Sequence, residues 1–393
     1  MSEVFIVDAM RTPIGSFGGT LAQVHPAELA RTVIASLLER SKLDPAAVDE
    51  VVLGCILQAG FGQNISRQAA IHAGIPVEKT AQTVNMMCGS GMRSVAMAAQ
   101  SIIAGDAELV IAGGSESMSM APYLLPKARQ GYRLGHGELQ DSLIYDALTD
   151  IFNNIHMGVT AENLAERYGI SREQQDAFAA ASQAKASKAV KEGVFDAELV
   201  PVAIPQRKGE PLRFARDEYP KESTTVEALA KLRPAFKAGG TVTAGNASGI
   251  NDGAAALLVA SEAACKLHGL KPIARIASYA WAGVEPAYMG IGPVPASRKA
   301  LQKAGWSLAD VDLIEANEAF AAQALSVGKE LEWDPSRVNV NGGAIALGHP
   351  VGASGARILV TLLHEMGRRS VKKGLATLCI GGGMGIAMCV ERI

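Results

Sequence analysis

Short apolar runs recur along the chain and predict the buried strands of an α/β fold. The clearest runs are Val4–Val7, Val51–Leu53, Leu109–Ala112, Leu313–Glu315 and Leu375–Ile380. Ala27–Arg40 instead predicts a helix. Small and apolar residues also recur after Gly91 and Gly355, which predicts helices reaching Ala104 and Leu363.

The middle of the chain is more polar than its flanks. Residues 119–249 carry 32 charged side chains, against 18 in residues 1–118 and 26 in residues 250–393. Ser171 and Gln174 form a capping-box pattern before a half-exposed helix over Glu173–Glu192. We therefore expect residues 119–249 to be a surface-rich insertion between two core-rich halves.

The two flanking parts resemble each other, which indicates a duplication. Three pairs of segments match in the same order, at offsets of 263, 264 and 268: Val48–Leu53 with Val311–Ala316, Cys88–Gly91 with Gly352–Gly355, and Val110–Gly114 with Leu378–Gly382. We expect one repeat in residues 1–118, completed by about residues 250–270, and the other in residues 271–393.

Composition narrows the class of protein. The net charge is −2, and hydrophobic residues make up 48% of the 393 residues. This balance argues against a disordered chain and against a nucleic-acid-binding protein, which usually has a basic surface. The five cysteines are an odd number without a Cys-x-x-Cys spacing, so we expect free thiols in a reducing cytoplasm.

We expect neither a membrane segment nor a metal site. The first apolar run stops at Asp8, which argues against a signal peptide. Leu375–Val390 contains four glycines and is too short to span a bilayer. The seven histidines are scattered, without the spacing of metal ligands.

Cys88 lies in Asn85-Met-Met-Cys-Gly-Ser-Gly91, where an extended segment ends and a helix is expected. The free N–H groups of a helix N-terminus favour a thiolate, and the glycines allow a bound group to approach the backbone. These features suit a nucleophile that attacks a carbonyl carbon. The alternative is a buried, unreactive cysteine.

A second candidate is His349, in Asn341-Gly-Gly-Ala-Ile-Ala-Leu-Gly-His-Pro-Val-Gly-Ala-Ser-Gly355. A neutral imidazole before a helix can accept a thiol proton. The alternative is a structural histidine in a glycine-rich turn. Because this loop repeats the Cys88 loop, we expect the two loops to converge.

Two further candidates follow buried strands. Cys379 precedes Gly381-Gly-Gly383, whose N–H groups could hold an oxyanion. The alternative is a packed thiol beside a tight glycine crossing. Asn317 could orient a water or a carbonyl, but taken by itself it is more typical of an N-cap of the next helix, because caps are far commoner than catalytic amides. Cys55, Cys265 and Cys389 lack such surroundings and are interpreted as structural.

The cysteine, Gly-His-Pro and Cys-x-Gly-Gly-Gly motifs, in this order and at this length, resemble the thiolase family. Within that family the chain is most similar to the short-chain acetyl-CoA acetyltransferases. The resemblance implies two repeated α/β halves, each with a mixed five-stranded sheet, helices between them, and a loop domain that covers coenzyme A. It also implies reversible condensation of two acetyl-CoA to acetoacetyl-CoA and CoA.

The resemblance implies a role for each candidate. Cys88 matches the nucleophile that becomes acetylated, and His349 matches the base that activates it. Cys379 matches the second acid/base, which acts on the acetyl methyl group. Asn317 matches the residue whose water forms one oxyanion hole with His349. The N–H groups of Cys88 and Gly381 match the other hole.

Further positions match residues that contact the acyl group or the coenzyme A arm in the family: His156, Met157, Phe236, Ala244, Ser248, Met289 and Phe320. Lys221 stands where many relatives have an arginine near the adenine; lysine keeps the charge but lacks the planar guanidinium. Met86 and Met87 also depart from the residues that relatives have before the nucleophile. Coenzyme A is expected as substrate and product, without a separate cofactor.

Other members of the superfamily remain as alternatives. A β-ketoacyl synthase would use a cysteine with two histidines, or a histidine and an asparagine, and Cys379 argues against it. The same cysteine argues against a hydroxymethylglutaryl-CoA synthase. Intact Cys88, His349 and Cys379 argue against a non-catalytic scaffold. The family implies a homotetramer, with a contact near Ala121–Ser142.

Overall fold

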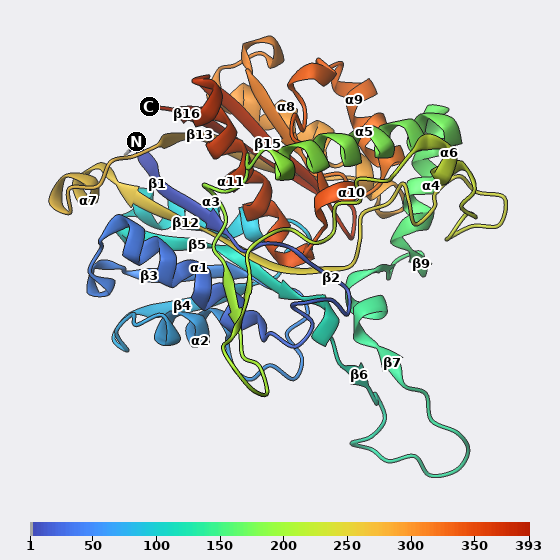
Figure 1. Cartoon of the computed structure of the whole chain (residues 1–393), viewed down its shortest axis with the longest axis horizontal. Coiled ribbons are helices and arrows are strands. Elements are labelled where there is room, and N and C mark those ends of the chain that lie inside the picture. The colour runs from blue at the N-terminus through green and yellow to red at the C-terminus, as the bar shows by residue number, and fades with distance from the viewer. Residues whose placement is uncertain (1–2) are drawn as a thin grey trace.

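The computed structural model describes residues 3–393 and has a mixed sheet with helices on both faces (Figure 1). The N-terminal half comprises β1 (Val4–Arg11), α1 (Pro26–Ser41), β3 (Glu50–Gly54), α2 (Ile65–His72), β4 (Thr80–Val84), α3 (Ser90–Ala104), β5 (Leu109–Ser117) and β12 (Asn251–Ser261). The C-terminal half comprises β13 (Ala274–Gly283), α8 (Pro293–Ala304), β14 (Leu313–Ala316), α9 (Ala321–Leu331), α11 (Val351–Arg369), β15 (Lys373–Ile380) and β16 (Met384–Arg392). The predicted α/β class is confirmed.

The two halves share one strand pattern. In the N-terminal half, β3 is parallel to β5, which is antiparallel to β12, which is antiparallel to β1. In the C-terminal half, β14 is parallel to β15, which is antiparallel to β16, which is antiparallel to β13. The repeated order agrees with the duplication read from the sequence.

The strands depart in two respects from the two separate five-stranded sheets that were expected. The halves form one continuous sheet, because Phe5 and Ile6 of β1 pair with Arg275 and Ala274 of β13. The N-terminal half has five main strands, with β4 beside β3. At the equivalent edge of the C-terminal half, Val338 forms only a single bridge to β14.

Helices α3 and α11 pack against each other between strands of both halves, while α1 and α2 lie outside the N-terminal strands and α8 lies outside the C-terminal strands (Figure 1). The two central helices approach closely at glycines. A methyl group at Gly91 would lie 2.8 Å from the nitrogen of Ala356, and one at Gly355 would lie 2.5 Å from the nitrogen of Met92. The absence of side chains therefore lets both helix N-termini, with their preceding loops, meet at one place.

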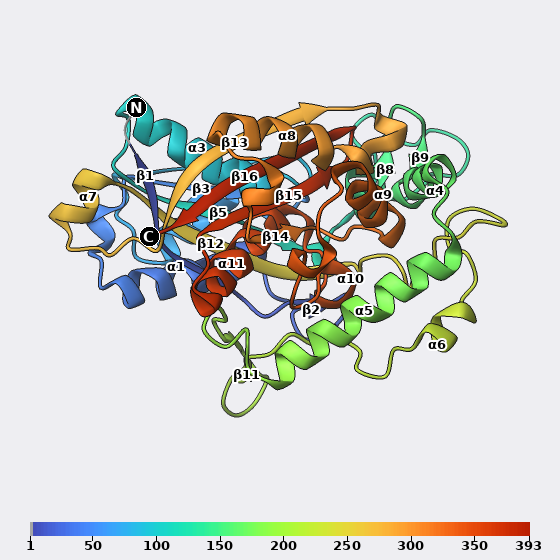
Figure 2. The same ribbon diagram turned by 90° about the horizontal axis from the view of Figure 1, so that it is seen from above.

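The segment between β5 and β12 is irregular and extends over the outside. It contains β6 (Tyr123–Leu124), β7 (Gln140–Asp141), β8 (Thr149–Asp150), β9 (Ile155–His156), α4 (Met157–Tyr168), α5 (Arg172–Lys191), β10 (Val202–Ile204), β11 (Leu212–Phe214) and α6 (Val226–Ala230). Ser171 caps α5 with the predicted capping box. Figure 2 shows α5 running along the outside of the molecule beside α10 (Ala344–Leu347).

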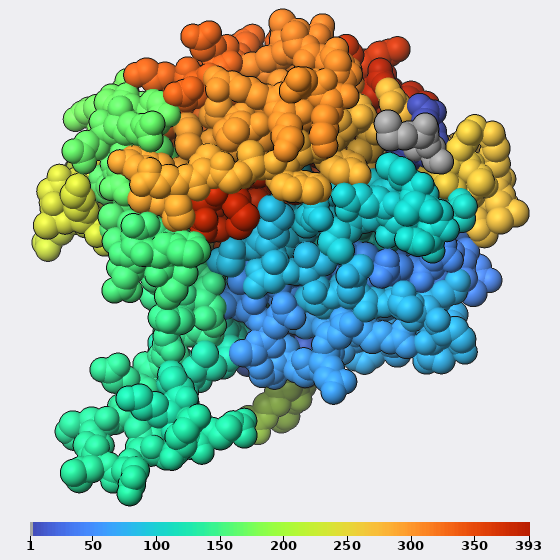
Figure 3. All heavy atoms as spheres, turned by 180° about the vertical axis from the view of Figure 1, so that it is seen from behind, coloured from blue at the N-terminus to red at the C-terminus, as the bar shows by residue number. Residues whose placement is uncertain are grey.

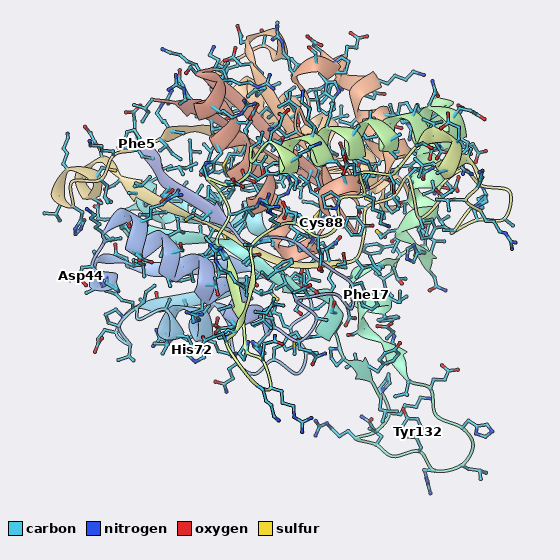
Figure 4. All side chains as sticks on the ribbon, viewed as in Figure 1. Phe5, Phe17, Asp44, His72, Cys88 and Tyr132 are labelled. Atoms are coloured by element: carbon cyan, nitrogen blue, oxygen red, sulfur yellow. The ribbon has the colours of Figure 1, made fainter. Side chains whose placement is uncertain are left out.

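The hairpin of β6 and β7 projects away from the body (Figures 1 and 3), and Tyr132 lies in its loop (Figure 4). Apolar side chains there are exposed, and Leu134 is fully so. This is the segment for which the resemblance implies a contact between subunits, and that contact stays a prediction. The insertion is tied to β1 by the buried Arg11 guanidinium, which donates to Asp217 and Glu198. The proposed domain boundaries likewise stay predictions.

Candidate active site

Cys88 lies in a tight turn between β4 and α3 and is half-buried; Figure 4 labels it near the middle of the view. Met87 has a φ of 47°, in the left-handed region. Ser90 holds this turn: its hydroxyl accepts from the N–H of Met86 and donates to the carbonyl of Met87, at 2.8 and 2.6 Å. The local hydrogen bonds thus fix the direction of the cysteine side chain.

His349 is buried at the start of α11, where Pro350 is the N-cap. Its Nδ1 lies 2.6 Å from Ser354 Oγ, which lies 2.9 Å from the carbonyl oxygen of Pro350. Because a carbonyl only accepts, the single hydroxyl proton of Ser354 goes to Pro350, and Nδ1 donates to Ser354. Nε2 therefore carries the lone pair, and it faces the amide nitrogen of Asn317 at 3.4 Å.

Cys379 is buried near the end of β15, directly before the turn that leads into β16. Gly382 and Gly383 both have a φ of 84°, so the turn requires residues without a Cβ. The backbone N–H groups of Gly381 and of Cys88 itself lie close enough to the Cys88 sulfur to favour its thiolate form. The C-terminal turn therefore directs a backbone donor at the sulfur of the N-terminal loop.

The three chemical groups share a single cavity. Cys88, His349 and Cys379 all line a cavity of about 300 Å³. Cys88 comes from the N-terminal half, whereas the other two come from the C-terminal half. The convergence of the repeated loops, expected from the sequence, is therefore observed.

Burial dominates the electrostatics of this cavity. It raises the pKa of Cys88 to about 11, although the N–H of Gly381 and the cysteine's own N–H favour the thiolate. Burial, followed by the positive charge of Arg357, lowers the pKa of His349 to about 3. Burial and the nearby Cys88 also raise the pKa of Cys379. At neutral pH the cavity thus contains two thiols and a neutral imidazole.

The helix N-terminus was expected to lower the pKa of Cys88, whereas burial raises it. Helix α3 begins two residues later, at Ser90, and Gly89 is its N-cap. The field of a helix is strongest at its first turn, and the thiol lies outside that turn. Two backbone donors do not offset the loss of solvation in this cavity.

Alkylation of Cys88 by iodoacetamide is expected to accelerate about tenfold per pH unit between about pH 7 and pH 10, because only the thiolate reacts. Peptide mass spectrometry at each pH would give the rate at this residue. A small free thiol is the control, and its rate should level off above a pKa of about 8.5. A rate at Cys88 that levels off below about pH 8 would contradict the assignment.

Most of the expected substrate contacts line the same cavity: His156, Met157, Phe236, Ala244, Ser248, Met289 and Phe320. Phe236 stacks on His156 at 4.7 Å between ring centroids and meets Phe320 edge-on at 6.1 Å. His156 also caps α4, where its Nδ1 accepts from the N–H of Gly158. A methyl group at Gly158 would collide with the Phe236 ring, so glycine is needed beneath it.

Two candidates lie beside the cavity. Lys221 is exposed, and its ammonium lies 5.6 Å from the ring centroid of Tyr219, which lines the cavity. Asn317 contacts His349 and does not cap α9, whose N-cap is Phe320. The alternative interpretation of Asn317 as a helix cap is therefore wrong.

Ser354 and Tyr219 are among the site residues that the sequence did not reveal. Ser354 fixes the orientation of His349, and the repeat could have revealed it, because Ser354 corresponds to Ser90 at the same offset of 264 as the loop itself. Tyr219 lines the cavity from the insertion, in a polar stretch without a motif.

Across residues 3–393, no three His, Cys, Asp or Glu side chains are grouped as a metal site would need. Within the same residues, the helices all fall short of the length and apolarity needed to cross a bilayer. The five cysteines are free.

Comparison with known proteins identifies the family. A model of the N-terminal thiolase domain matches residues 4–263, and a model of the C-terminal thiolase domain matches residues 270–392. This chain belongs to the thiolase family. The thiolase is 63% identical over 392 residues to an acetyl-CoA acetyltransferase of Pseudomonas aeruginosa, with all of both chains covered.

Two solved structures are similar to this thiolase. The acetyl-CoA acetyltransferase of Bacillus anthracis has a TM-score of 0.98 and 49% identity, and human mitochondrial 3-ketoacyl-CoA thiolase has a TM-score of 0.96 and 45% identity. Each comparison covers all of this thiolase and 99% of the other chain. The duplicated fold of this thiolase is therefore that of its family.

Proposed function

We propose that this thiolase is an acetyl-CoA C-acetyltransferase. It condenses two acetyl-CoA to acetoacetyl-CoA and CoA, reversibly, through an acetyl group on Cys88. The observation that carries the proposal is the cavity in which Cys88, His349 and Cys379 meet. One sulfur can hold an acyl group while the other moves a proton, as this condensation requires. The names of the relatives at 49–63% identity support the same activity.

In the first half-reaction, His349 Nε2 accepts the thiol proton of Cys88 as the sulfur attacks the thioester carbon of acetyl-CoA. Its orientation fits this role, because Ser354 fixes the proton on Nδ1 and leaves the lone pair on Nε2. The carbon–sulfur bond of acetyl-CoA then breaks, and the CoA thiolate takes the proton from His349. Neutral partners avoid forming a buried ion pair before the substrate arrives.

The acyl oxygen becomes negative during this attack and needs donors. The N–H groups of Cys88 and Gly381, which favour negative charge on the Cys88 sulfur, suit an oxyanion hole beside that sulfur. Loss of one donor from such a hole typically lowers the rate by about 10²–10³-fold.

In the second half-reaction, His349 Nε2 takes the thiol proton of Cys379, and the Cys379 thiolate removes a proton from the methyl carbon of a second acetyl-CoA. The enolate oxygen would face the second hole, formed by the protonated Nε2 of His349 and a water held by Asn317. The enolate attacks the acetyl group on Cys88, the carbon–sulfur bond to Cys88 breaks as acetoacetyl-CoA forms, and the Cys88 thiolate takes the proton back from His349. The Oδ1 of Asn317 is buried and accepts no hydrogen bond within residues 3–393, so it is free to bind a water.

Coenzyme A acts here as substrate and product, and neither half-reaction uses a bound cofactor. The apolar stack of His156, Phe236 and Phe320 would contact the pantetheine arm. Lys221, beside Tyr219, would lie near the adenine end. The homotetramer and the cytoplasmic location implied by the resemblance and the cysteine pattern belong to the same proposal.

Purified protein is expected to cleave acetoacetyl-CoA with free CoA into two acetyl-CoA, at a kcat of order 1–10³ s⁻¹, as is typical of enzymes. Chromatography of the CoA esters would measure both the loss of substrate and the ratio of two products per substrate. A protein that binds acetoacetyl-CoA without cleaving it would be a scaffold and would refute the proposal.

A further inference from the structure

One buried carboxylate near the reactive groups takes no part in either half-reaction. Glu116 lies near the end of β5, and its side chain is fully buried. Its two oxygens accept from three backbone N–H groups, those of Ile56 at 3.0 Å, Leu57 at 3.1 Å and Gly352 at 2.9 Å. The thiol of Cys55 lies 3.5 Å from the same carboxylate. A buried charge destabilises the fold unless it is well paired, so these partners define what the carboxylate does.

The three N–H groups belong to opposite halves of the chain. Ile56 and Leu57 follow β3, whereas Gly352 is the second residue of α11 and lies three residues after His349. The side chains of Ile56 and Leu57 belong to the apolar cluster that packs against Cys88. The carboxylate therefore joins the start of the helix that follows the base to the loop that supports the nucleophile.

The start of α11 is packed against the N-terminal half at backbone distance. A methyl group at Gly114 or Gly54 would lie 2.1 or 2.7 Å from the carbonyl oxygen of Gly352. A methyl group at Gly352 would lie 2.4 Å from Glu116 Oε2. The first N–H groups of a helix have no partner within the helix, and they favour a negative charge. Glu116 supplies this charge from the other half of the chain.

We propose that Glu116 is a positioning residue for acyl transfer in this thiolase. By binding both segments, its carboxylate holds His349 Nε2 and the sulfur of Cys88 in register, so that the thiol proton can move as the sulfur attacks. The alternative is a carboxylate that only stabilises the fold. This inference rests on the proposed function, because it concerns the proton transfer between His349 and Cys88.

The charge of Glu116 makes a specific test possible. Its negative charge opposes the thiolate of Cys88. Burial raises the pKa of Glu116 to about 7, although the three N–H donors favour its carboxylate, so the charged form predominates at about pH 8.5. Removal of the charge should therefore leave the sulfur at least as reactive toward a small alkylating agent, while slowing a transfer that needs His349 in place.

The test is Glu116→Gln, assayed at about pH 8.5. Glutamine has the same shape, but its Nε2 must face at least one N–H donor, so at least one segment loses its partner. We expect kcat for thiolysis of acetoacetyl-CoA to fall by about 10²-fold, the effect of a misplacement of about 1 Å, while KM stays within about twofold. Iodoacetamide should alkylate Cys88 at the native rate or faster.

Glu162→Gln is the matched control. Glu162 is also a buried carboxylate that accepts from backbone N–H groups, those of Thr241 and Val242, but it does not line the reactive cavity. The same loss of a buried acceptor should lower its unfolding temperature to a similar extent. Its kcat should stay within about threefold of the native value, because the pair of His349 and Cys88 is not disturbed.

A kcat of folded Glu116→Gln within about threefold of the native value would overturn the inference, and so would an equal loss of kcat in Glu162→Gln. Alkylation of Cys88 that slows in parallel with kcat would also overturn it, because the sulfur itself would then be disturbed. If Glu116→Gln does not fold, Glu116→Asp decides: it keeps the charge but is too short to reach both segments, and it must show the same fall in kcat. Failure of the native protein to cleave acetoacetyl-CoA would overturn the proposed function, and this inference with it.

Discussion

Replacing Cys88 with alanine is expected to lower turnover of acetoacetyl-CoA by at least about 10⁴-fold, because both half-reactions pass through an acyl group on this sulfur. The other thiol in the cavity is a poor substitute. Burial and the neighbouring sulfur raise the pKa of Cys379, and it lies near the end of a strand without the turn that directs Cys88. The loss should appear in kcat and in kcat/KM alike.

The measurement is mass spectrometry of intact protein after incubation with acetyl-CoA, together with the thiolysis rate. The native protein should gain one acetyl group, located on the Cys88 peptide, and Cys88→Ala should gain none. Cys265→Ala is the matched control, since Cys265 is a buried thiol in the outer core of the N-terminal half. An acetyl group on another cysteine of Cys88→Ala, with retained turnover, would refute the role of Cys88.

The duplication could be predicted from the sequence because it is encoded in order and spacing. The segments at offsets of 263 and 268 became equivalent strands, β3 with β14 and β5 with β15. The glycines that follow Cys88 and His349 could be found for the same reason. They permit the close approach of α3 and α11, which brings the two loops into one cavity.

The joining of the two half-sheets into one sheet could not be predicted from the sequence. It depends on pairing between strands that lie far apart along the chain. Two residues of β1 pair with residues of β13 that lie 270 and 268 positions away, and no local pattern encodes such a contact. The missing edge strand of the C-terminal half could not be predicted either. The repeat implies a counterpart of β4 at Val338, but only a single bridge forms there. The chain instead makes a helical turn at Pro335–Arg337 and a glycine turn at Gly342.

The protonation states also lay beyond the sequence. A helix after Cys88 was correctly predicted, but the size of its effect depends on depth and on where the helix begins. In this cavity desolvation outweighs the backbone donors, and it raises the pKa of Cys88 and lowers that of His349. Residue types identified the reactive groups, while only the packing shows that they rest uncharged.

This resting state suits a thiolase that must handle two proton transfers in a small space. A permanent thiolate and imidazolium would need compensation inside a cavity of about 300 Å³. Neutral groups leave the charge to develop on the acyl oxygen, where the N–H groups of Cys88 and Gly381 are already directed. Charge is then stabilised mainly in the transition state, which is what accelerates a reaction.

Replacing Cys379 with alanine is expected to separate the two half-reactions. The variant should still become acetylated on Cys88 by acetyl-CoA, because His349 and the N–H of Gly381 remain in place. Condensation should fall by roughly 10³-fold, within the range that a general acid–base residue contributes, because no group is left to remove the methyl proton. Acetylated protein should therefore accumulate when only acetyl-CoA is supplied.

Intact-protein mass spectrometry would follow the acetylated fraction, and chromatography would follow acetoacetyl-CoA. Cys389→Ala is the matched control: this cysteine is also buried and its pKa is also raised by burial, to about 11, but it lies in β16, away from the cavity. It should acetylate and condense at nearly the native rate. Normal condensation by Cys379→Ala would rule out the second sulfur as the proton carrier. Loss of acetylation together with condensation would instead place Cys379 in the first half-reaction.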